Sequence, residues 1–193
     1  MRAGEVIAFP TETVFGLGAS IYRPEAIHRI YQIKSRSKQK PLSLHLSSLE
    51  DINTFAKDLP PIFRHLAKRF LPGPLTMVVS KKEGMIPAQE DFTTIGIRIP
   101  DHEICRNLIS YSGPILATSA NFSNKVDLIS PEEVWEMFQG RISGILSDGK
   151  SLIYERPSTV ISFSKQNTPL LLREGAIPFE DIISFSSQCL QKP

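Results

Sequence analysis

Cysteine and long apolar runs are scarce in this chain of 193 residues. Its two cysteines, Cys105 and Cys189, lie far apart and form no CxxC pair. This usage is typical of a reducing compartment and argues against a secreted disulfide framework. No apolar stretch approaches the ~20 residues that a membrane span requires, and no signal peptide is evident. We therefore expect a cytoplasmic protein that does not enter the membrane.

Compositional bias is absent as well. Hydrophobic residues make up 41% of the chain and charged residues 22%, and the 11 glycines and 15 prolines fall short of a disordered or collagen-like sequence. A chain of this length buries enough surface to fold without disulfides or a structural metal. Since no linker or repeat interrupts it, we expect residues 1–193 to form a single domain.

Acidic residues are missing between Glu25 and Glu50, although the chain as a whole carries a net charge of only +2. A basic block of this kind is typical of a polyphosphate or nucleic-acid site. It is equally typical of a solvated helix end, where cations favour the helix dipole. The basic residues of the block are Arg29, Lys34, Arg36, Lys38 and Lys40.

Hydrophobic periodicity predicts alternating strands and helices. We expect strands near 5–9, 41–46, 75–80, 95–99, 115–117, 142–146, 159–163 and 170–172, with a loop after the first. Helices are expected at 24–33, 49–56, 61–70, 104–109, 131–138 and 180–188, with Asp101 capping the fourth and a capping box from Ser130 to Glu133 opening the fifth. Several strand pairs lack a helix between them, which indicates an α/β fold with a mixed sheet.

One familiar phosphate-binding motif is a chance match. Residues 144–151 satisfy GxxxxGK[ST], but the sequence after Ser151 has no helical face and reaches Pro157 within six residues. A true P-loop needs a helix there, and Ile145 and Leu146 are predicted to lie in a strand. HExxH, GxSxG and clustered metal ligands are also absent from the sequence, which leaves zinc hydrolysis and serine-hydrolase chemistry without support.

Small polar and basic side chains follow several predicted strands, where ligands bind in open α/β sheets. Thr94 and Arg98 share one face of a strand, about 13 Å apart by strand rise. Each residue alone is as well explained as a turn former, a helix cap or a solvated charge, so the argument rests on their joint occurrence. The candidates by segment are Thr11, Thr13, Gly16 and Gly18; Lys34, Arg36 and Lys40; Thr94 and Arg98; and Thr118, Ser119 and Asn121.

The sequence resembles the YrdC-like family of L-threonylcarbamoyladenylate synthases over nearly its whole length. The matching segments are PTETVFGLG at 10–18, Lys34-Ser35-Arg36 with Lys40-Pro41-Leu42 and His45, PGPLT at 72–76, Arg98-Ile99-Pro100, Ser119-Ala120-Asn121 with Ser123, Ser130-Pro131, Ser158-Thr159-Val160, and LREGAI at 172–177. The chain departs from the family pattern at Phe15, Ser35, Ser37 and Lys40, where Tyr, Gly, Pro and Asn are usual. We expect it to correspond to the short, single-domain form.

The resemblance implies a twisted mixed sheet with flanking helices around a large basic cavity. It implies a nucleotidyltransferase that converts L-threonine, bicarbonate and ATP into threonylcarbamoyl-AMP and pyrophosphate, with Mg²⁺ accompanying the ATP. Proteins that modify tRNA would then use the threonylcarbamoyl-AMP. By this resemblance Thr13, His45, Arg98, Ser119 and Ser158 bind threonine, and Lys34, Arg36, Lys40, Thr94, Asn121, Ser130 and Arg173 bind ATP.

Residue chemistry agrees with that division. The Arg98 guanidinium can grip the threonine carboxylate with two parallel hydrogen bonds, and the basic block can spread the charge of a triphosphate. No covalent nucleophile is evident, so catalysis is expected to rest on positioning and electrostatics, with the basic loop after Ser35 as a lid. The alternatives are an RNA-binding module with a basic cavity and no catalysis, and the related chemistry of larger carbamoyltransferases. Weak binding of RNA is a separate prediction among the partners.

Overall fold

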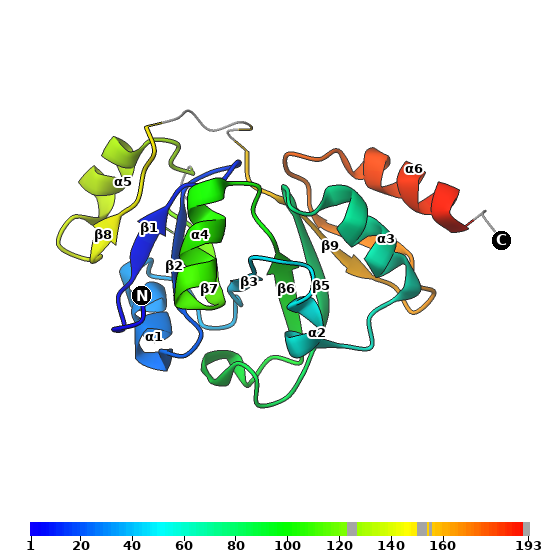
Figure 1. Ribbon diagram of the computed structural model, residues 1–193, viewed down its shortest axis with the longest axis horizontal. Helices are drawn as coiled ribbons and strands as arrows, with labels where there is room; N and C mark the ends of the chain where they lie inside the picture. Colours follow the sequence, from blue (N-terminus) through cyan, green and yellow to red (C-terminus); the bar gives the residue numbers. More distant parts are fainter. Residues whose placement is uncertain (123–126, 150–153, 155, 191–193) are drawn as a thin grey trace.

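The computed structural model describes residues 1–122, 127–149, 154 and 156–190 (Figure 1). The strands are β1 (Ile7–Phe9), β2 (Gly16–Ser20), β3 (Ser43–His45), β4 (Ala56–Lys57), β5 (Leu75–Lys81), β6 (Thr94–Arg98), β7 (Ile115–Ser119), β8 (Gly144–Ile145), β9 (Thr159–Phe163) and β10 (Pro169–Arg173). The helices are α1 (Pro24–Ile33), α2 (Ile52–Phe55), α3 (Pro61–Phe70), α4 (Glu103–Ser112), α5 (Pro131–Phe138) and α6 (Phe179–Leu190), with a 3₁₀ turn η1 (Pro87–Gln89).

In this part of the chain the strands form one ten-stranded sheet. Its order is β10-β9-β5-β6-β3-β7-β2-β1-β8, and β4 pairs with β5 outside this path. The pairs β1–β8, β3–β6 and β5–β9 are parallel, whereas β1–β2, β2–β7, β3–β7 and β5–β6 are antiparallel. The predicted mixed sheet is therefore confirmed: it contains parallel and antiparallel pairs, and β2 and β3 both pair antiparallel with β7, which is distant from them in sequence.

Strand β2 corrects the expectation of a loop after the first strand. Its five residues are all buried, and it lies inside the sheet between β1 and β7, with which it pairs. Its glycines weaken a strand signal in the sequence, but packing leaves no room for a side chain at either of them. A Cβ at Gly16 would lie 2.6 Å from Cε2 of Phe9, which is fully buried. The sheet thus accepts a poor strand former because a phenyl ring occupies the side-chain space.

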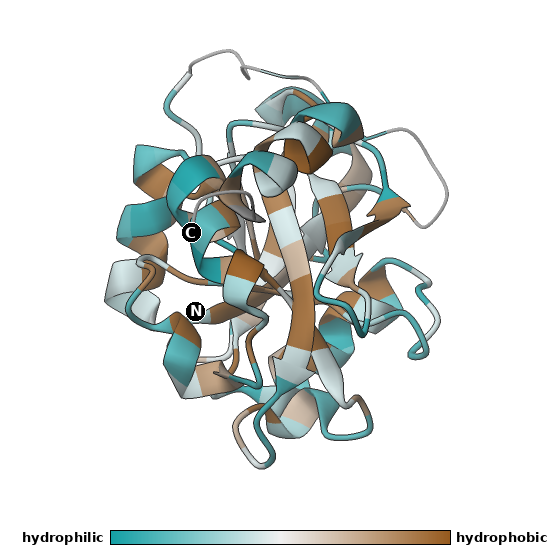
Figure 2. Cartoon of the chain, turned by 90° about the vertical axis from the view of Figure 1, so that its right-hand side faces the viewer, coloured by the Kyte–Doolittle hydropathy of each residue, from teal (hydrophilic) through white to brown (hydrophobic). Residues whose placement is uncertain are grey.

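Helices cover the sheet with apolar faces at helical spacing. Helix α1 buries Ala26, Ile27, Ile30 and Tyr31, and α3 packs beside α6 at the other end of the sheet (Figure 1). Figure 2 shows hydrophobic residues along the central strands and hydrophilic residues on the outer turns and helix faces. Burial of these faces is the main driving force for this arrangement.

Helix α4 begins differently from the prediction. Its N-cap is His102, without a side-chain cap hydrogen bond, and not Asp101. The Asp101 carboxylate instead accepts a hydrogen bond at 2.9 Å from Nη1 of Arg106, so a charged partner on the first turn takes the place of the backbone amide. The buried face of α4 contributes Cys105 and Ile109 to a small apolar cluster with Phe9, Ile115 and Ala117.

The two cysteines are free, with Cys105 buried and Cys189 half-buried. Among the described helices, none has both the length and the apolar character to cross a bilayer. The GxxxxGK[ST] match begins in β8, as expected for a strand, while Lys150 and Ser151 lie outside the described residues.

Candidate functional site

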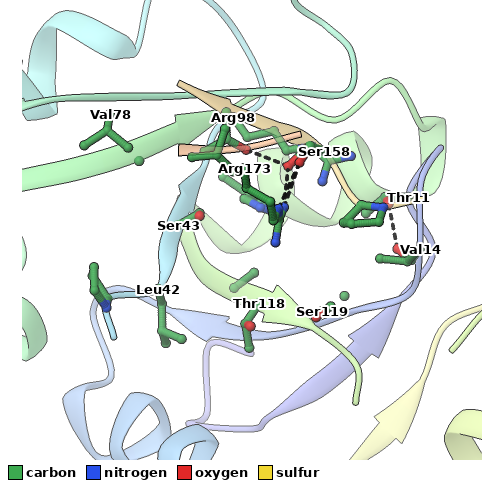
Figure 3. Close-up of a pocket in the computed structure, with 18 of the residues that line it drawn as sticks. Thr11, Val14, Leu42, Ser43, Val78, Arg98, Thr118, Ser119, Ser158 and Arg173 are labelled. Atoms are coloured by element: carbon green, nitrogen blue, oxygen red, sulfur yellow. Dashed lines mark hydrogen bonds between the residues drawn. The ribbon is translucent and has the colours of Figure 1, made fainter. Parts of the chain in front are cut away.

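A cavity of about 330 Å³ crosses one face of the sheet. It is lined by strands β3, β5, β6, β7, β9 and β10, and by the segment that joins β1 to β2. In Figure 3 Arg98, Arg173 and Ser158 lie on one side of this cavity, and Thr118 and Ser119 lie across from them. Its described lining includes three arginines, Arg36, Arg98 and Arg173, and neither Asp nor Glu. That the cavity as a whole is basic stays a prediction.

Strand alternation explains why these side chains meet. On β6, Thr94, Gly96 and Arg98 line the cavity, whereas Ile95 and Ile97 belong to the core on the opposite face. Successive side chains of a strand point to opposite faces, so every second residue reaches the same side. The prediction that Thr94 and Arg98 share a strand face is confirmed. Strands β3 and β5 repeat the pattern with Ser43 and His45, and with Thr76 and Val78.

Arg98 is held in place by two buried side chains. Its Nη2 donates to Oε1 of Glu12 at 2.9 Å and to Oγ1 of Thr13 at 2.7 Å, and both carboxylate and guanidinium are buried. Those two bonds engage both protons of Nη2. An arginine donates two parallel hydrogen bonds to a carboxylate through Nη2 together with either Nε or Nη1. The pair expected for a bound carboxylate would therefore need one of the Nη2 protons that Glu12 and Thr13 already accept.

Ser158 joins two neighbouring elements at the cavity wall. Its Oγ lies 2.9 Å from Oγ1 of Thr76, and its carbonyl oxygen accepts a hydrogen bond from Nη2 of Arg173 at 2.8 Å. Burial lowers the pKa of Arg173, although an arginine remains charged at neutral pH. Thr76 was not predicted to be a site residue; its place in the motif at 72–76 and its alternation along the strand are the signals that could have indicated it.

His45 faces the cavity as a neutral imidazole. Burial, and secondarily the charge of Arg98, lower its pKa to about 3. Its ring makes an edge-to-face contact with Phe9, with centroids 6.2 Å apart. A neutral imidazole donates one hydrogen bond from its protonated nitrogen and accepts one at the other nitrogen, which suits a hydroxyl or ammonium group of a small ligand.

Lys34 is buried behind the cavity wall. Its Nζ donates to Oδ1 of Asn121 at 2.9 Å and to the backbone oxygens of Ser119 and Asn121. Burial, and then the charge of Arg36, lower the pKa of Lys34 to about 7, while Asp127 acts in the opposite direction. Oγ of Ser119, which does line the cavity, donates to the same Asn121 oxygen at 2.8 Å. Lys34 thus joins the end of α1 to the end of β7.

The rest of the basic block is divided between the cavity and solvent. Arg36 lines the cavity, with Nε donating to the Lys40 carbonyl and Nη2 to the Pro41 carbonyl, both at 3.1 Å. The side chain of Lys40 is exposed and is not part of the lining.

Ser130, a predicted ATP-binding residue, forms the predicted capping box of α5: its Oγ accepts from the Glu133 amide at 3.1 Å.

The structure brings most of the candidate residues together, and their ligand assignments stay predictions. Thr13 is held beside the cavity through Arg98, whereas Lys34, Lys40, Asn121 and Ser130 are outside the lining. Glu12 was treated in the sequence only as part of a motif, and no local pattern marks it as the partner of a residue 86 positions away. The candidates that line the cavity are Arg36, His45, Thr94, Arg98, Ser119, Ser158 and Arg173.

The sequence of the chain matches that of a known protein family. Residues 1–175 match the model of the Sua5/YciO/YrdC family, which carries the description "Telomere recombination". The chain belongs to this family. The match covers every segment that contributes to the cavity.

Two curated relatives named threonylcarbamoyl-AMP synthase are similar over most of the chain. The protein of Pyrococcus abyssi is 42% identical over 185 residues, which are 94% of this chain and 54% of the relative. The protein of Bacillus subtilis is 39% identical over 185 residues, or 94% of this chain and 53% of the relative. The chain therefore spans about half the length of these two family members.

A solved structure confirms the fold. The crystal structure of P. abyssi Sua5 complexed with L-threonine is 41% identical, with a TM-score of 0.87, and the match covers 95% of this chain and 54% of that one. The predicted α/β fold with a twisted mixed sheet and flanking helices thus agrees with a family member of known structure.

Proposed function

We propose that this protein is a threonylcarbamoyl-AMP synthase, a nucleotidyltransferase that makes threonylcarbamoyl-AMP and pyrophosphate from L-threonine, bicarbonate and ATP. The observation that carries the proposal is the cavity in which Arg98, His45, Ser119 and Ser158 lie beside Arg36 and Arg173. Two family relatives bear this name, and another family structure was determined with L-threonine. The product would serve proteins that install threonylcarbamoyladenosine in tRNA.

The proposed reaction has two steps. The amine of threonine takes up carbon dioxide from bicarbonate, which forms an N–C bond and releases hydroxide, and the amine proton neutralises that hydroxide as water. A carbamate oxygen then attacks the α-phosphorus of ATP, and the bond to the bridging oxygen breaks to release pyrophosphate. The proposal needs no covalent intermediate with the protein, so the enzyme would act by positioning the reactants and stabilising charge.

Side chains of the cavity suit these roles. Arg98 would bind the threonine carboxylate, and the Ser119 and Ser158 hydroxyls and the neutral His45 ring would hold its amine and hydroxyl. Arg36 and Arg173 would contact the triphosphate and stabilise the negative charge that develops on pyrophosphate. Exclusion of water would matter because a carbamate is labile, and the loop after Ser35 is our candidate for the closing segment.

Mg²⁺ is proposed only as the counter-ion of ATP. Among the described residues no group of three or more His, Cys, Asp or Glu side chains could hold a metal ion. The donors present do not form a protein-built magnesium site, so we assign the ion to phosphate oxygens and water, and no step above depends on it.

The decisive experiment measures pyrophosphate release from ATP while L-threonine and bicarbonate are omitted in turn and L-serine replaces threonine. Release should require both substrates and prefer threonine. Arg98→Ala should lose at least about 100-fold in kcat/KM, which corresponds to removal of a charged contact. Arg106→Ala, which removes an arginine on α4 that pairs with Asp101, is the matched control and should retain activity. ATP binding without pyrophosphate release under any condition would overturn the proposal.

RNA binding without catalysis is the less well supported hypothesis. The basic block does not form one exposed face, since Lys34 is buried and Arg36 points to the cavity while Lys38 and Lys40 are exposed. An RNA-binding module would show an affinity that falls steeply with salt, and a flat dependence would exclude it. The cytoplasmic location also stays a prediction.

A further inference from the structure

Glu12 contacts the site without being part of its lining. It lies in the buried segment between β1 and β2 and is 1% exposed. Its Oε1 accepts from Nη2 of Arg98, a residue that lines the cavity, whereas Glu12 itself lines a different cavity of about 350 Å³ together with Pro74 and Tyr154. The carboxylate therefore reaches the guanidinium from behind the wall.

The neighbouring threonines complete this support. Oγ1 of Thr13 accepts from the same Nη2, lies 2.8 Å from Oγ1 of Thr11, and Thr11 donates to the Val14 carbonyl at 2.7 Å. Both Nη2 protons are thus committed to a short segment whose side chains are buried. Within the described residues, neither Nε nor Nη1 of Arg98 donates to a protein group. Nε is buried, whereas Nη1 is not among the buried unpaired atoms, so Nη1 is the nitrogen that a ligand can reach.

We propose that Glu12 is a positioning residue, which orients Arg98 so that Nη1 presents its protons to the carboxylate of the amino-acid substrate. This inference rests on the proposed function and deepens it. A hydrogen bond to a fixed carboxylate restricts the rotation of the guanidinium, which lowers the entropy lost when a ligand binds. The substrate carboxylate then accepts from Nη1 alone, while Nη2 stays with Glu12 and Thr13.

Three substitutions separate position from charge. Glu12→Gln keeps an oxygen at the same reach, and its amide NH₂ replaces Oε2, which has no hydrogen-bond partner among the described residues. Glu12→Asp keeps the charge but withdraws the carboxylate by one methylene, about 1.5 Å, which breaks a 2.9 Å hydrogen bond. Glu12→Ala removes both. If the position of the oxygen matters and its charge does not, the threonine affinity of the glutamine variant stays close to that of the wild type, and the affinities of the aspartate and alanine variants fall.

The first measurement is calorimetric titration with L-threonine, followed by steady-state kinetics. We expect the Kd and KM for threonine to rise no more than about threefold in Glu12→Gln and at least about tenfold in Glu12→Asp and Glu12→Ala, with kcat little changed, because the lost contact acts in ground-state binding. Glu90→Gln, which removes a partly exposed carboxylate paired with Lys81, is the control and should leave threonine affinity unchanged. An aspartate variant that matches the wild type, with a glutamine variant as weak as alanine, would overturn the proposal in favour of charge compensation.

The second measurement does not depend on the reaction. NMR of the Arg98 guanidinium should show slow rotation about Cζ–Nη2 in the wild-type and glutamine proteins, and fast rotation in the aspartate and alanine proteins, each checked for folding by thermal denaturation. Fast rotation in the wild type would overturn the positioning role whatever the enzyme does. Slow rotation in a wild type that neither binds threonine nor releases pyrophosphate would instead show that the proposed function is wrong, and with it the substrate part of this inference.

Discussion

At the scale of single residues, His45 links the cavity to the stability of the fold. Its folded pKa of about 3 lies below the ordinary value of about 6.5 because burial and Arg98 disfavour the charged ring. The unfolded chain therefore binds a proton between these two pH values and the folded protein does not. The contribution of this pKa difference to the free energy of unfolding is fully present above about pH 6.5 and declines as the pH falls toward 3.

The expected size of this effect can be measured by urea denaturation. Between pH 7.5 and pH 5 the free energy of unfolding should fall by about 2 kcal/mol on account of His45, and His45→Gln should lack this component. The lower limit of pH 5 lies above the pH values at which most carboxylates titrate, so these groups contribute little to the change. Parallel curves for the two proteins would show that His45 takes up a proton in the folded state.

At the scale of elements, the turn after β10 is packed against the segment that carries Ser158. A Cβ at Gly175 would lie 2.2 Å from the carbonyl oxygen of Pro157 and 2.5 Å from the carbonyl carbon of Ser158. Oγ1 of Thr159 accepts the Gly175 and Ile177 amides at 3.0 and 3.1 Å, which fixes the approach of the two segments.

Gly175→Ala should therefore cost about 1–3 kcal/mol of stability and weaken threonine binding, because backbone atoms have to move and Ser158 moves with them. Gly144→Ala is the matched control, since a Cβ there meets nothing within 4 Å and should change stability by less than about 0.5 kcal/mol. Chemical denaturation and calorimetric titration give the two quantities. A neutral Gly175→Ala variant would mean that the turn is looser than the structure indicates.

At the scale of the whole molecule, the cavity depends on segments from Thr11 to Arg173, so a ligand should stabilise the entire sheet. L-threonine at about 100 times its Kd should raise the free energy of unfolding by about 2.7 kcal/mol. Hydrogen exchange should slow in β3, β6 and β9 together, and Arg98→Ala should lose the effect. Protection confined to one loop would contradict a site built across the sheet.

Local sequence determined much of the framework, because its signals depend on neighbours in the chain. The spacing of apolar residues predicted α1 and α3, Ser130 and Glu133 predicted the cap of α5, and alternation predicted the cavity face of β6. Each of these follows from helical or strand periodicity or from side-chain capping within a few residues. The family resemblance, which rests on motifs along the chain, was also readable from sequence and is confirmed.

Tertiary structure alone decided the features that depend on distant partners. Strand β2 exists because β1 and β7 pair with it and Phe9 fills the space over Gly16, although the glycines argue locally for a loop. Burial of Lys34 required Asn121, 87 positions away, and the support of Arg98 by Glu12 required a contact across 86 positions. Periodicity indicates which face a residue occupies, but only the pairing of strands determines which other residue shares that face, and the free energy of a buried charge depends on that partner.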